Sequence, residues 1–285
     1  FKDTLGKDDP NFIGLQNPGG TRASLLDKDI TYKQAAQVLP FANTLTTTKI
    51  TSAQFKKVLE QQWQRAGTGE VPSRPYLQLG VSSNVTYTYD ESRKEGDRIT
   101  SVWVNGKPID PKGTYTVGSG SFLIAGRDNF TELAKGSKPV DSGKIDLSVW
   151  VDWIKAHKTL KPDFAKRAVS LTTSLHEGTS RDTTFTLGKP ADKAVAPDTV
   201  DFTSKDAVVN TIMKAQIVQD DKTVDVATTP VKDGWSSVSV KVPTAKGLVS
   251  GEATTVFTFP DSGTTVRFAA KLSVPSGDHP GGAVI

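Results

Sequence analysis

Three short segments hold side chains that could bind an anionic, aromatic small molecule. The first, Gln16–Arg22, follows the strand-like run Phe12–Gln16, so it begins where a strand gives way to a loop, a common place for ligand groups. Gly19 and Gly20 allow close approach of the backbone and offer N–H groups to an anion. Arg22 adds a planar guanidinium suited to phosphate. A surface turn beside an ordinary arginine would have the same sequence, so this segment alone does not decide function.

The other two segments supply aromatic rings and a carboxylate. Val38–Phe41 carries its phenylalanine directly after Pro40, and its simpler interpretation is a helix stop with a buried ring. Ser121–Phe130 places Phe122 six residues before Asp128, with a flexible glycine between them. An aromatic face holds a nucleobase with about 1–3 kcal/mol per stacked base, and an aspartate can accept both hydroxyls of a ribose. An arginine, two phenylalanines and an aspartate are together the components of a nucleotide site.

Groups suited to hydrolytic catalysis are scarce in this chain. It has three histidines, His157, His176 and His279, which lie far apart in sequence, and it has no cysteine. A hydrolytic metal pair needs several converging imidazoles and carboxylates, and a catalytic serine needs a positioned histidine. The motifs GxSxG, HExxH and GxxxxGK[ST] do not occur. We therefore expect no catalysis by this chain alone, and no metal or other cofactor bound within it.

Helical and strand signals alternate over the first 170 residues. Amphipathic spacing and apolar alternation predict helices over 31–38, 51–66 and 147–157, and strands over 12–16, 85–89, 99–104 and 115–118. Asn105-Gly106 predicts a tight turn after the third of these strands. The expected fold class is an α+β domain over residues 1–170.

Helical spacing disappears after Arg167, and strand candidates then recur roughly ten residues apart. Two alternating apolar stripes stand out: Val238, Val240 and Val242, and then Val266, Phe268, Ala270, Leu272 and Val274. The glycine-bearing loop Pro260–Gly263 predicts a hairpin that leads into the second stripe. We therefore predict an all-β immunoglobulin-like sandwich over residues 171–275 and a flexible tail over 276–285.

Charge is unevenly divided between these two parts. The net charge is +4; residues 1–170 carry 24 Lys and Arg against 18 Asp and Glu, and the remainder carries 11 against 13. A mildly basic domain suits an anionic small molecule, whereas the lack of a dense Lys/Arg block argues against a nucleic-acid partner. No apolar run approaches the roughly eighteen residues that a membrane span requires.

The motifs occur in a specific order: NPGGTRASL, ITYKQAAQVLPFANTL, ITSAQFKKVLEQ, RPYLQLG, VTYTYD, RITSVWVNGKPID and TYTVGSGSFLIAGRDNF. Together they resemble the C-terminal domain of 5'-nucleotidases, over about residues 11–170. The resemblance implies a domain that binds the nucleoside of a nucleotide or nucleotide sugar. It also implies a separate metallophosphoesterase domain that holds two divalent metal ions and has no counterpart in this chain, so we expect the chain to be an inactive piece of a longer hydrolase.

The resemblance assigns a set of substrate-binding residues: Asn17, Gly19, Gly20, Arg22, Phe41, Phe122 and Asp128. Phe41 and Phe122 correspond to the two rings that sandwich the base, and Asn17 to an asparagine that contacts it. Arg22 corresponds to the arginine of a GGxR segment that reaches the phosphate. Asp128 corresponds to the acid that holds the ribose hydroxyls.

The chain departs from the family pattern at Arg127, which stands where the family has a glycine beside that acid. Arg127 would either add a phosphate contact or reshape the pocket, and the sequence leaves both open.

Two functions therefore remain open from the sequence. One is nucleotide or nucleoside recognition within a secreted or cell-surface phosphohydrolase, and the other is an interaction or adhesion module in which the β-sandwich is the functional part. The resemblance implies an extracellular or cell-surface location, and the absence of cysteine agrees with a bacterial cell-wall protein. Attachment to the wall would then use sequence beyond the C-terminus.

Overall fold

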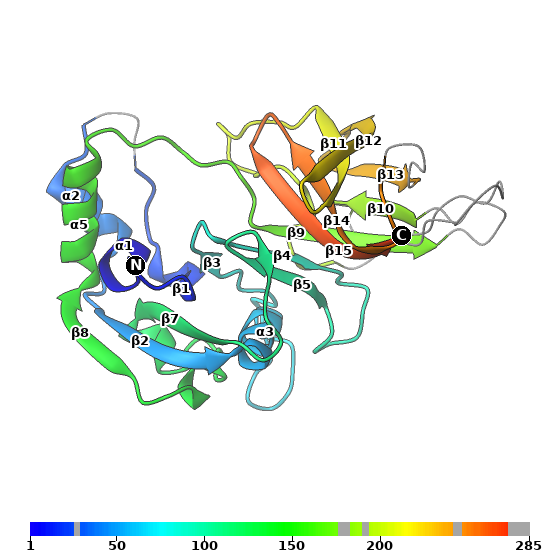
Figure 1. The fold of residues 1–285 in the computed structure, drawn as a ribbon. Coiled ribbons are helices and arrows are strands. Elements are labelled where there is room, and N and C mark those ends of the chain that lie inside the picture. Colours follow the sequence, from blue (N-terminus) through cyan, green and yellow to red (C-terminus); the bar gives the residue numbers. More distant parts are fainter. Residues whose placement is uncertain (26–28, 176–182, 190–193, 242–246, 273–285) are drawn as a thin grey trace, which may run out of the picture. The chain divides into compact units, whose positions relative to one another are not determined.

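The computed structural model describes residues 1–25, 29–175, 183–189, 194–241 and 247–272. It divides into two compact units, Phe1–Val85 with Val104–Pro162, and Thr86–Trp103 with Asp163–Ile285 (Figure 1). This division differs from the predicted single boundary after residue 170. Residues 86–103 join the second unit because strand β4 (Val85–Tyr89) pairs in parallel with β9 (Ala168–Leu175).

The first unit is built on a five-stranded sheet with the order β3-β1-β7-β2-β8. Its strands are β1 (Phe12–Gln16), β2 (Thr44–Thr51), β3 (Gly80–Val81), β7 (Thr114–Gly120) and β8 (Val140–Ile145). Its helices are α1 (Lys2–Leu5), α2 (Tyr32–Val38), α3 (Ser52–Glu60), α4 (Ser121–Ile124) and α5 (Asp146–His157), with short 3-10 turns η1 (Pro18–Gly20) and η2 (Leu133–Lys135). β1 and β7 run parallel, and the other neighbours run antiparallel. The predicted mixture of helices and strands is confirmed for this part of the chain.

Local sequence explains where the helices of this unit begin. Thr31 and Thr51 each cap a helix, and in both cases the glutamine three residues later completes a reciprocal capping box. The prediction that the second of these helices runs to residue 66 was wrong, because α3 ends at Glu60. Beyond that point Trp63 forms an isolated antiparallel bridge with Tyr76, which requires extended backbone.

The second unit contains only strands among its described residues. Its strands not yet introduced are β5 (Ile99–Val104), β10 (Thr183–Leu187), β11 (Ile212–Gln219), β12 (Lys222–Pro230), β13 (Ser236–Val240), β14 (Gly251–Phe259) and β15 (Thr264–Leu272). The short strand β6 (Lys107–Pro108) falls within the residues of the first unit. One sheet has the order β13-β10-β9-β4-β5-β6 and the other β12-β11-β14-β15. A single apolar cluster draws on both sheets, for example Phe185 from β10 and Phe257 from β14, whose ring centroids lie 5.0 Å apart.

Turns and stripes in the strand-rich regions follow the predictions where the structure describes them. Asn105 and Gly106 both have positive φ, 51° and 73°, as a tight hairpin turn of this kind requires. β14 and β15 pair in antiparallel register across the predicted loop. Val242, Val274, His176, His279 and the tail 276–285 lie outside the described residues.

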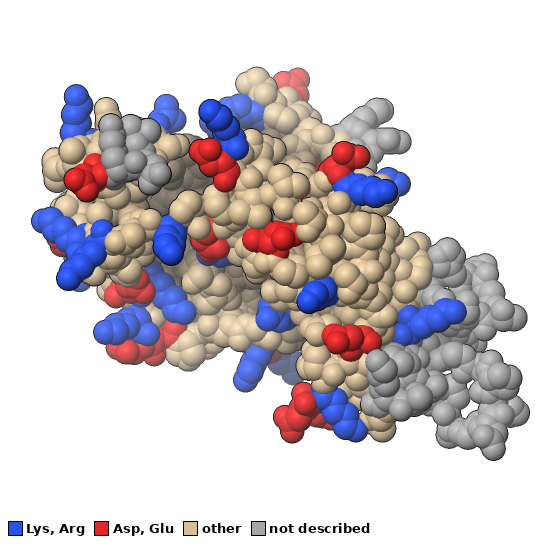
Figure 2. Space-filling view, turned by 90° about the horizontal axis from the view of Figure 1, so that it is seen from above, with Lys and Arg blue, Asp and Glu red and all other residues tan. Residues whose placement is uncertain are grey.

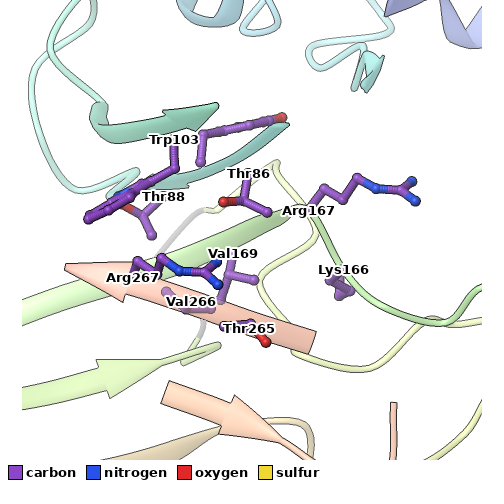
Figure 3. A pocket seen from close by; sticks show the side chains of 10 residues that line it. Thr86, Thr88, Trp103, Lys166, Arg167, Val169, Thr265, Val266 and Arg267 are labelled. Atoms are coloured by element: carbon purple, nitrogen blue, oxygen red, sulfur yellow. The ribbon is translucent and has the colours of Figure 1, made fainter. Parts of the chain in front are cut away.

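The second unit also carries a shallow hollow lined by strand residues and by two adjacent cations, Lys166 and Arg167 (Figure 3). Lys166 is only 6% exposed, and its Nζ donates a hydrogen bond to the backbone oxygen of Thr199. Burial lowers the pKa of Lys166 to about 8, against the opposing effect of the Asp201 and Asp198 carboxylates. The charged form of Lys166 is therefore stabilised by its hydrogen bond and the nearby carboxylates, but loss of hydration destabilises it more.

The buried lysine predicts an unusual pH dependence of stability. Its pKa is lower in the folded than in the unfolded chain, so between about pH 8 and 10.5 the unfolded state binds more protons, and the free energy of unfolding rises with pH. From pH 7.5 to 9.5 the gain should be about 1–2 kcal/mol, measured by urea denaturation followed by circular dichroism. Lys166→Met should remove this gain, whereas Lys271→Met at an exposed position should keep it. An equal pH dependence in wild type and Lys166→Met would contradict the assignment.

Candidate functional site

The loops that carry the predicted residues leave the first unit's sheet at one end. In the parallel pair β1 and β7, Gly14 stands opposite Gly118, so both strands finish at the same edge. β2 runs the other way and begins there, since Leu45 stands opposite Gly120. Figure 1 shows these strands side by side. The segments after β1, before β2 and after β7 are therefore neighbours, although they are far apart in sequence.

Asn17 and Asp128 are joined directly at this edge. Asn17 Nδ2 donates a hydrogen bond of 2.8 Å to Asp128 Oδ2, across 111 positions of sequence. Asn17 is the only side-chain hydrogen-bond partner of the Asp128 carboxylate within the described part of the chain. A carboxylate offers about four lone-pair sites, so Asp128 retains acceptor capacity for a ligand hydroxyl.

The two glycines lie against this hydrogen bond. A Cβ placed on Gly19 would lie 3.6 Å from Asp128 Oδ2 and 3.7 Å from Asn17 Nδ2. A Cβ on Gly20 would lie only 2.3 Å from Gln16 Nε2 and 2.6 Å from Asn17 Oδ1, which is a clash. Gly20 thus leaves room for the side chains of Gln16 and Asn17 to lie close to its backbone at the turn η1, and a larger residue there would require those side chains to shift.

Arg22 is tied to the segment that leads to Phe41. Its backbone N–H donates a hydrogen bond of 2.9 Å to the carbonyl oxygen of Val38, the last residue of α2. The side chains of Arg22 and Arg127 are exposed, and neither forms an ion pair or side-chain hydrogen bond with any residue that the structure describes. Both guanidinium groups can therefore meet an anion without first breaking such a contact.

Both predicted aromatic rings are exposed. Phe41 is 58% exposed and Phe122 is 43% exposed, so the simpler interpretation of Phe41 as a buried helix stop is wrong. Phe122 lies in α4, whose other apolar side chains, Leu123 and Ile124, are each 1% exposed and anchor the helix to the core. The core thus holds the backbone of α4 while the ring of Phe122 stays accessible.

Charge on the molecular surface is mixed. Figure 2 shows Lys and Arg interspersed with Asp and Glu on the face in view, without a wide area of one sign. The described residues on this face therefore form no broad basic surface.

The described residues offer no ligand set for the two divalent metal ions that the resemblance implies. No group of three or more His, Cys, Asp or Glu side chains among them could hold a metal ion. His157 instead closes α5, where its ring stacks on Trp153 with centroids 4.0 Å apart. The described residues therefore do not fit a metal pair.

Gln64 and Asn129 also shape this region, and sequence reasoning did not single them out. Asn129 follows Asp128 directly and donates a hydrogen bond of 2.9 Å to Gln64 Oε1. A glutamine that is 3% exposed must have its amide satisfied, but burial at position 64 has no sequence signal once the helix has ended.

No helix in the described ranges is long and apolar enough to cross a membrane.

Comparison with known proteins gives consistent matches for about half of the chain. Residues 1–135 match the family model described as the 5'-nucleotidase, C-terminal domain. A 5'-nucleotidase-related protein from Glossina morsitans morsitans is 34% identical over 158 residues, covering 53% of this chain and 28% of the relative. The snake venom 5'-nucleotidase of Macrovipera lebetinus is 30% identical over 177 residues, covering 57% of this chain and 41% of the relative.

Solved structures also match over a similar share of the chain. The 5'-nucleotidase precursor from Thermus thermophilus is 31% identical, with a TM-score of 0.47, covering 55% of this chain and 31% of that chain. The chain thus spans less than half the length of each of these relatives. Residues 1–135 match the C-terminal domain of 5'-nucleotidases, and the chain is similar to several 5'-nucleotidases, among them the snake venom protein.

Proposed function

We propose that the first unit binds the nucleoside portion of a nucleotide. The base would stack between Phe41 and Phe122 and contact Asn17, the ribose hydroxyls would bind Asp128, and the phosphate would face Arg22. The observation that carries the proposal is the 2.8 Å hydrogen bond between Asn17 and Asp128, at the sheet edge from which both aromatic segments also leave.

The state of each group supports these roles. Two large rings exposed to water lose unfavourable hydration when a base covers them, and stacking contributes about 1–3 kcal/mol per base. Asp128 has acceptor sites left, and Arg22 has no competing ion pair among the described residues. Stacking with one charge-assisted contact gives an expected Kd in the micromolar to millimolar range.

The wider context is also proposed. The chain would recognise the substrate, while hydrolysis would require a metallophosphoesterase domain with two divalent metal ions. The second unit would be an immunoglobulin-like sandwich that acts as a spacer, which is supported by two sheets sharing one core. The venom relative supports an extracellular protein, and we propose a bacterial cell-surface location with attachment beyond residue 285.

Titration of the isotope-labelled chain with adenosine, followed by NMR, tests the proposal. Amide shifts should change around Asn17, Phe41, Phe122 and Asp128, with saturation in the micromolar to millimolar range. The same chain should release no phosphate from AMP in the presence of Mg²⁺, Mn²⁺ or Zn²⁺. Shift changes confined to the second unit, or no change at several millimolar adenosine, would show that the proposed site does not bind nucleosides.

A further inference from the structure

Two consecutive residues of the candidate site hold a backbone conformation that residues with a Cβ rarely adopt. Asp128 has φ of 55° and Asn129 has φ of 65°, both in the left-handed region. Asn and Asp tolerate this region better than other residues, but two in succession still require support from their surroundings. The direction of the Asp128 carboxylate depends on this conformation.

The support comes from the side chain of Gln64. Asn129 Nδ2 donates to Gln64 Oε1 at 2.9 Å, while Gln64 Nε2 donates to the carbonyl oxygen of Gln61 at 2.8 Å. A carbonyl oxygen can only accept, so Nε2 must face Gln61 and Oε1 must face Asn129. The carboxamide is only 3% exposed as part of Gln64, which excludes water as an easy substitute partner.

The backbone around Gln64 is itself fixed. Gln64 donates its backbone N–H to the carbonyl oxygen of Pro75 at 2.8 Å. Gln61 adds a second link to the same loop, because its Nε2 donates to Thr131 Oγ1 at 2.8 Å and its Oε1 accepts from the backbone N–H of Glu132 at 3.2 Å. The segment that follows α3 therefore holds the loop 128–132 at more than one point.

From this geometry we propose that Gln64 is a positioning residue for the candidate site. Its carboxamide accepts a hydrogen bond from Asn129 and thereby stabilises the left-handed backbone conformation of residues 128 and 129. This conformation keeps the Asp128 carboxylate in its hydrogen bond with Asn17 and available to the ligand. Gln64 contacts no ligand itself. The inference rests on the proposed function, since Asp128 serves as the ribose acceptor only if a nucleoside binds here.

Binding of two nucleosides, one with and one without the 2' and 3' hydroxyls, distinguishes a loss of Asp128 positioning from a general loss of protein stability. Gln64→Met, made in the full chain, removes the acceptor for Asn129 at nearly constant side-chain length. It should weaken adenosine binding by about threefold to tenfold, as expected for one partly buried hydrogen bond, and should leave 2',3'-dideoxyadenosine binding within about twofold. Gln216→Met, at a hydrogen-bonded glutamine of the second unit, is the matched control and should change neither affinity. Equal adenosine affinity in Gln64→Met and wild type would overturn the proposal.

A chain that carries Asn129→Gly tests whether the positive φ at position 129 is the reason that the Gln64 contact is needed. Glycine adopts positive φ without a Cβ penalty, so Asn129→Gly should not need the Gln64 contact. Gln64→Met should then cost no further adenosine affinity in the Asn129→Gly background, and an equal loss in both backgrounds would overturn the proposed cause. If Gln64→Met does not fold, Asn129→Ala breaks the same hydrogen bond from the loop side and should show the same difference between the two nucleosides.

A ligand-free readout keeps this inference distinct from the proposed function. Backbone chemical shifts of Asp128 and Asn129 report their left-handed conformation without any nucleoside. They should change in Gln64→Met, and unchanged shifts would overturn the positioning role. If wild type fails to bind adenosine while these shifts do change, then the proposed function fails and the structural role of Gln64 stands.

Discussion

Phe122→Ala and Phe41→Ala should each weaken adenosine binding by about 5- to 150-fold. The range follows from about 1–3 kcal/mol for each base–ring contact. Both rings are largely exposed in the folded chain, at 43% for Phe122 and 58% for Phe41, so their removal should alter the free energy of unfolding only slightly. Calorimetry or NMR titration measures the affinity, and a thermal melt checks the fold.

Phe202→Ala provides a matched control for the ring variants. Phe202 is 41% exposed, close to the value for Phe122, but it lies in the second unit, where it meets Phe164 edge-on. Its loss should leave adenosine affinity unchanged. If Phe122→Ala binds adenosine as tightly as wild type does, the stacking model is wrong, and so is the role of α4 in presenting that ring.

Asp128→Asn should also weaken adenosine binding strongly, and the size of the loss should depend on whether the ligand carries ribose hydroxyls. Asparagine tolerates the left-handed backbone at this position, so the loop should persist while the charge disappears. Hydrogen bonds to a charged group contribute about 1.5–3 kcal/mol, so adenosine affinity should fall by about 10- to 150-fold. Binding of 2',3'-dideoxyadenosine, which lacks both ribose hydroxyls, should fall far less.

Comparison of the two nucleosides decides how the Asp128 result is interpreted. An equal loss for both would mean that the substitution disturbs the loop rather than the ribose contact. No loss for either would remove Asp128 from the site. Asp8→Asn, at an exposed aspartate of the same unit, tests whether a simple change of net charge has any effect.

Strong local signals predicted much of the fold. The apolar run at Phe12–Gln16 and the Asn-Gly turn at 105–106 have the predicted bounds, because burial and turn geometry act there on adjacent residues. β2 was not predicted, although it lies between β7 and β8 in the sheet. Leu45 lies on one face of the strand, whereas Thr46, Thr48 and Ile50 share the other face, so its apolar period is weak, and the neighbouring strands rather than the sequence pattern stabilise it.

The candidate site could likewise be predicted from the sequence only in part. Asn17, Phe41, Phe122 and Asp128 lie within short motifs, and their side chains are of types that bind nucleosides, so the sequence alone predicts them as site residues. Their roles in binding a nucleoside stay predictions. The hydrogen bond from Asn129 to Gln64 joins residues 65 positions apart, and two ordinary amides in a polar run carry no signal of such a contact. Long-range contacts of this type come from the fold and not from local pattern.

An intermolecular NOE experiment on the adenosine complex tests most directly whether the base lies between Phe41 and Phe122. We predict contacts from the adenine H2 and H8 protons to the ring protons of both Phe41 and Phe122 in one complex, and ribose contacts in the loop around Asp128. Contacts to only one of the two rings, or to residues of the second unit alone, would contradict a base held between them.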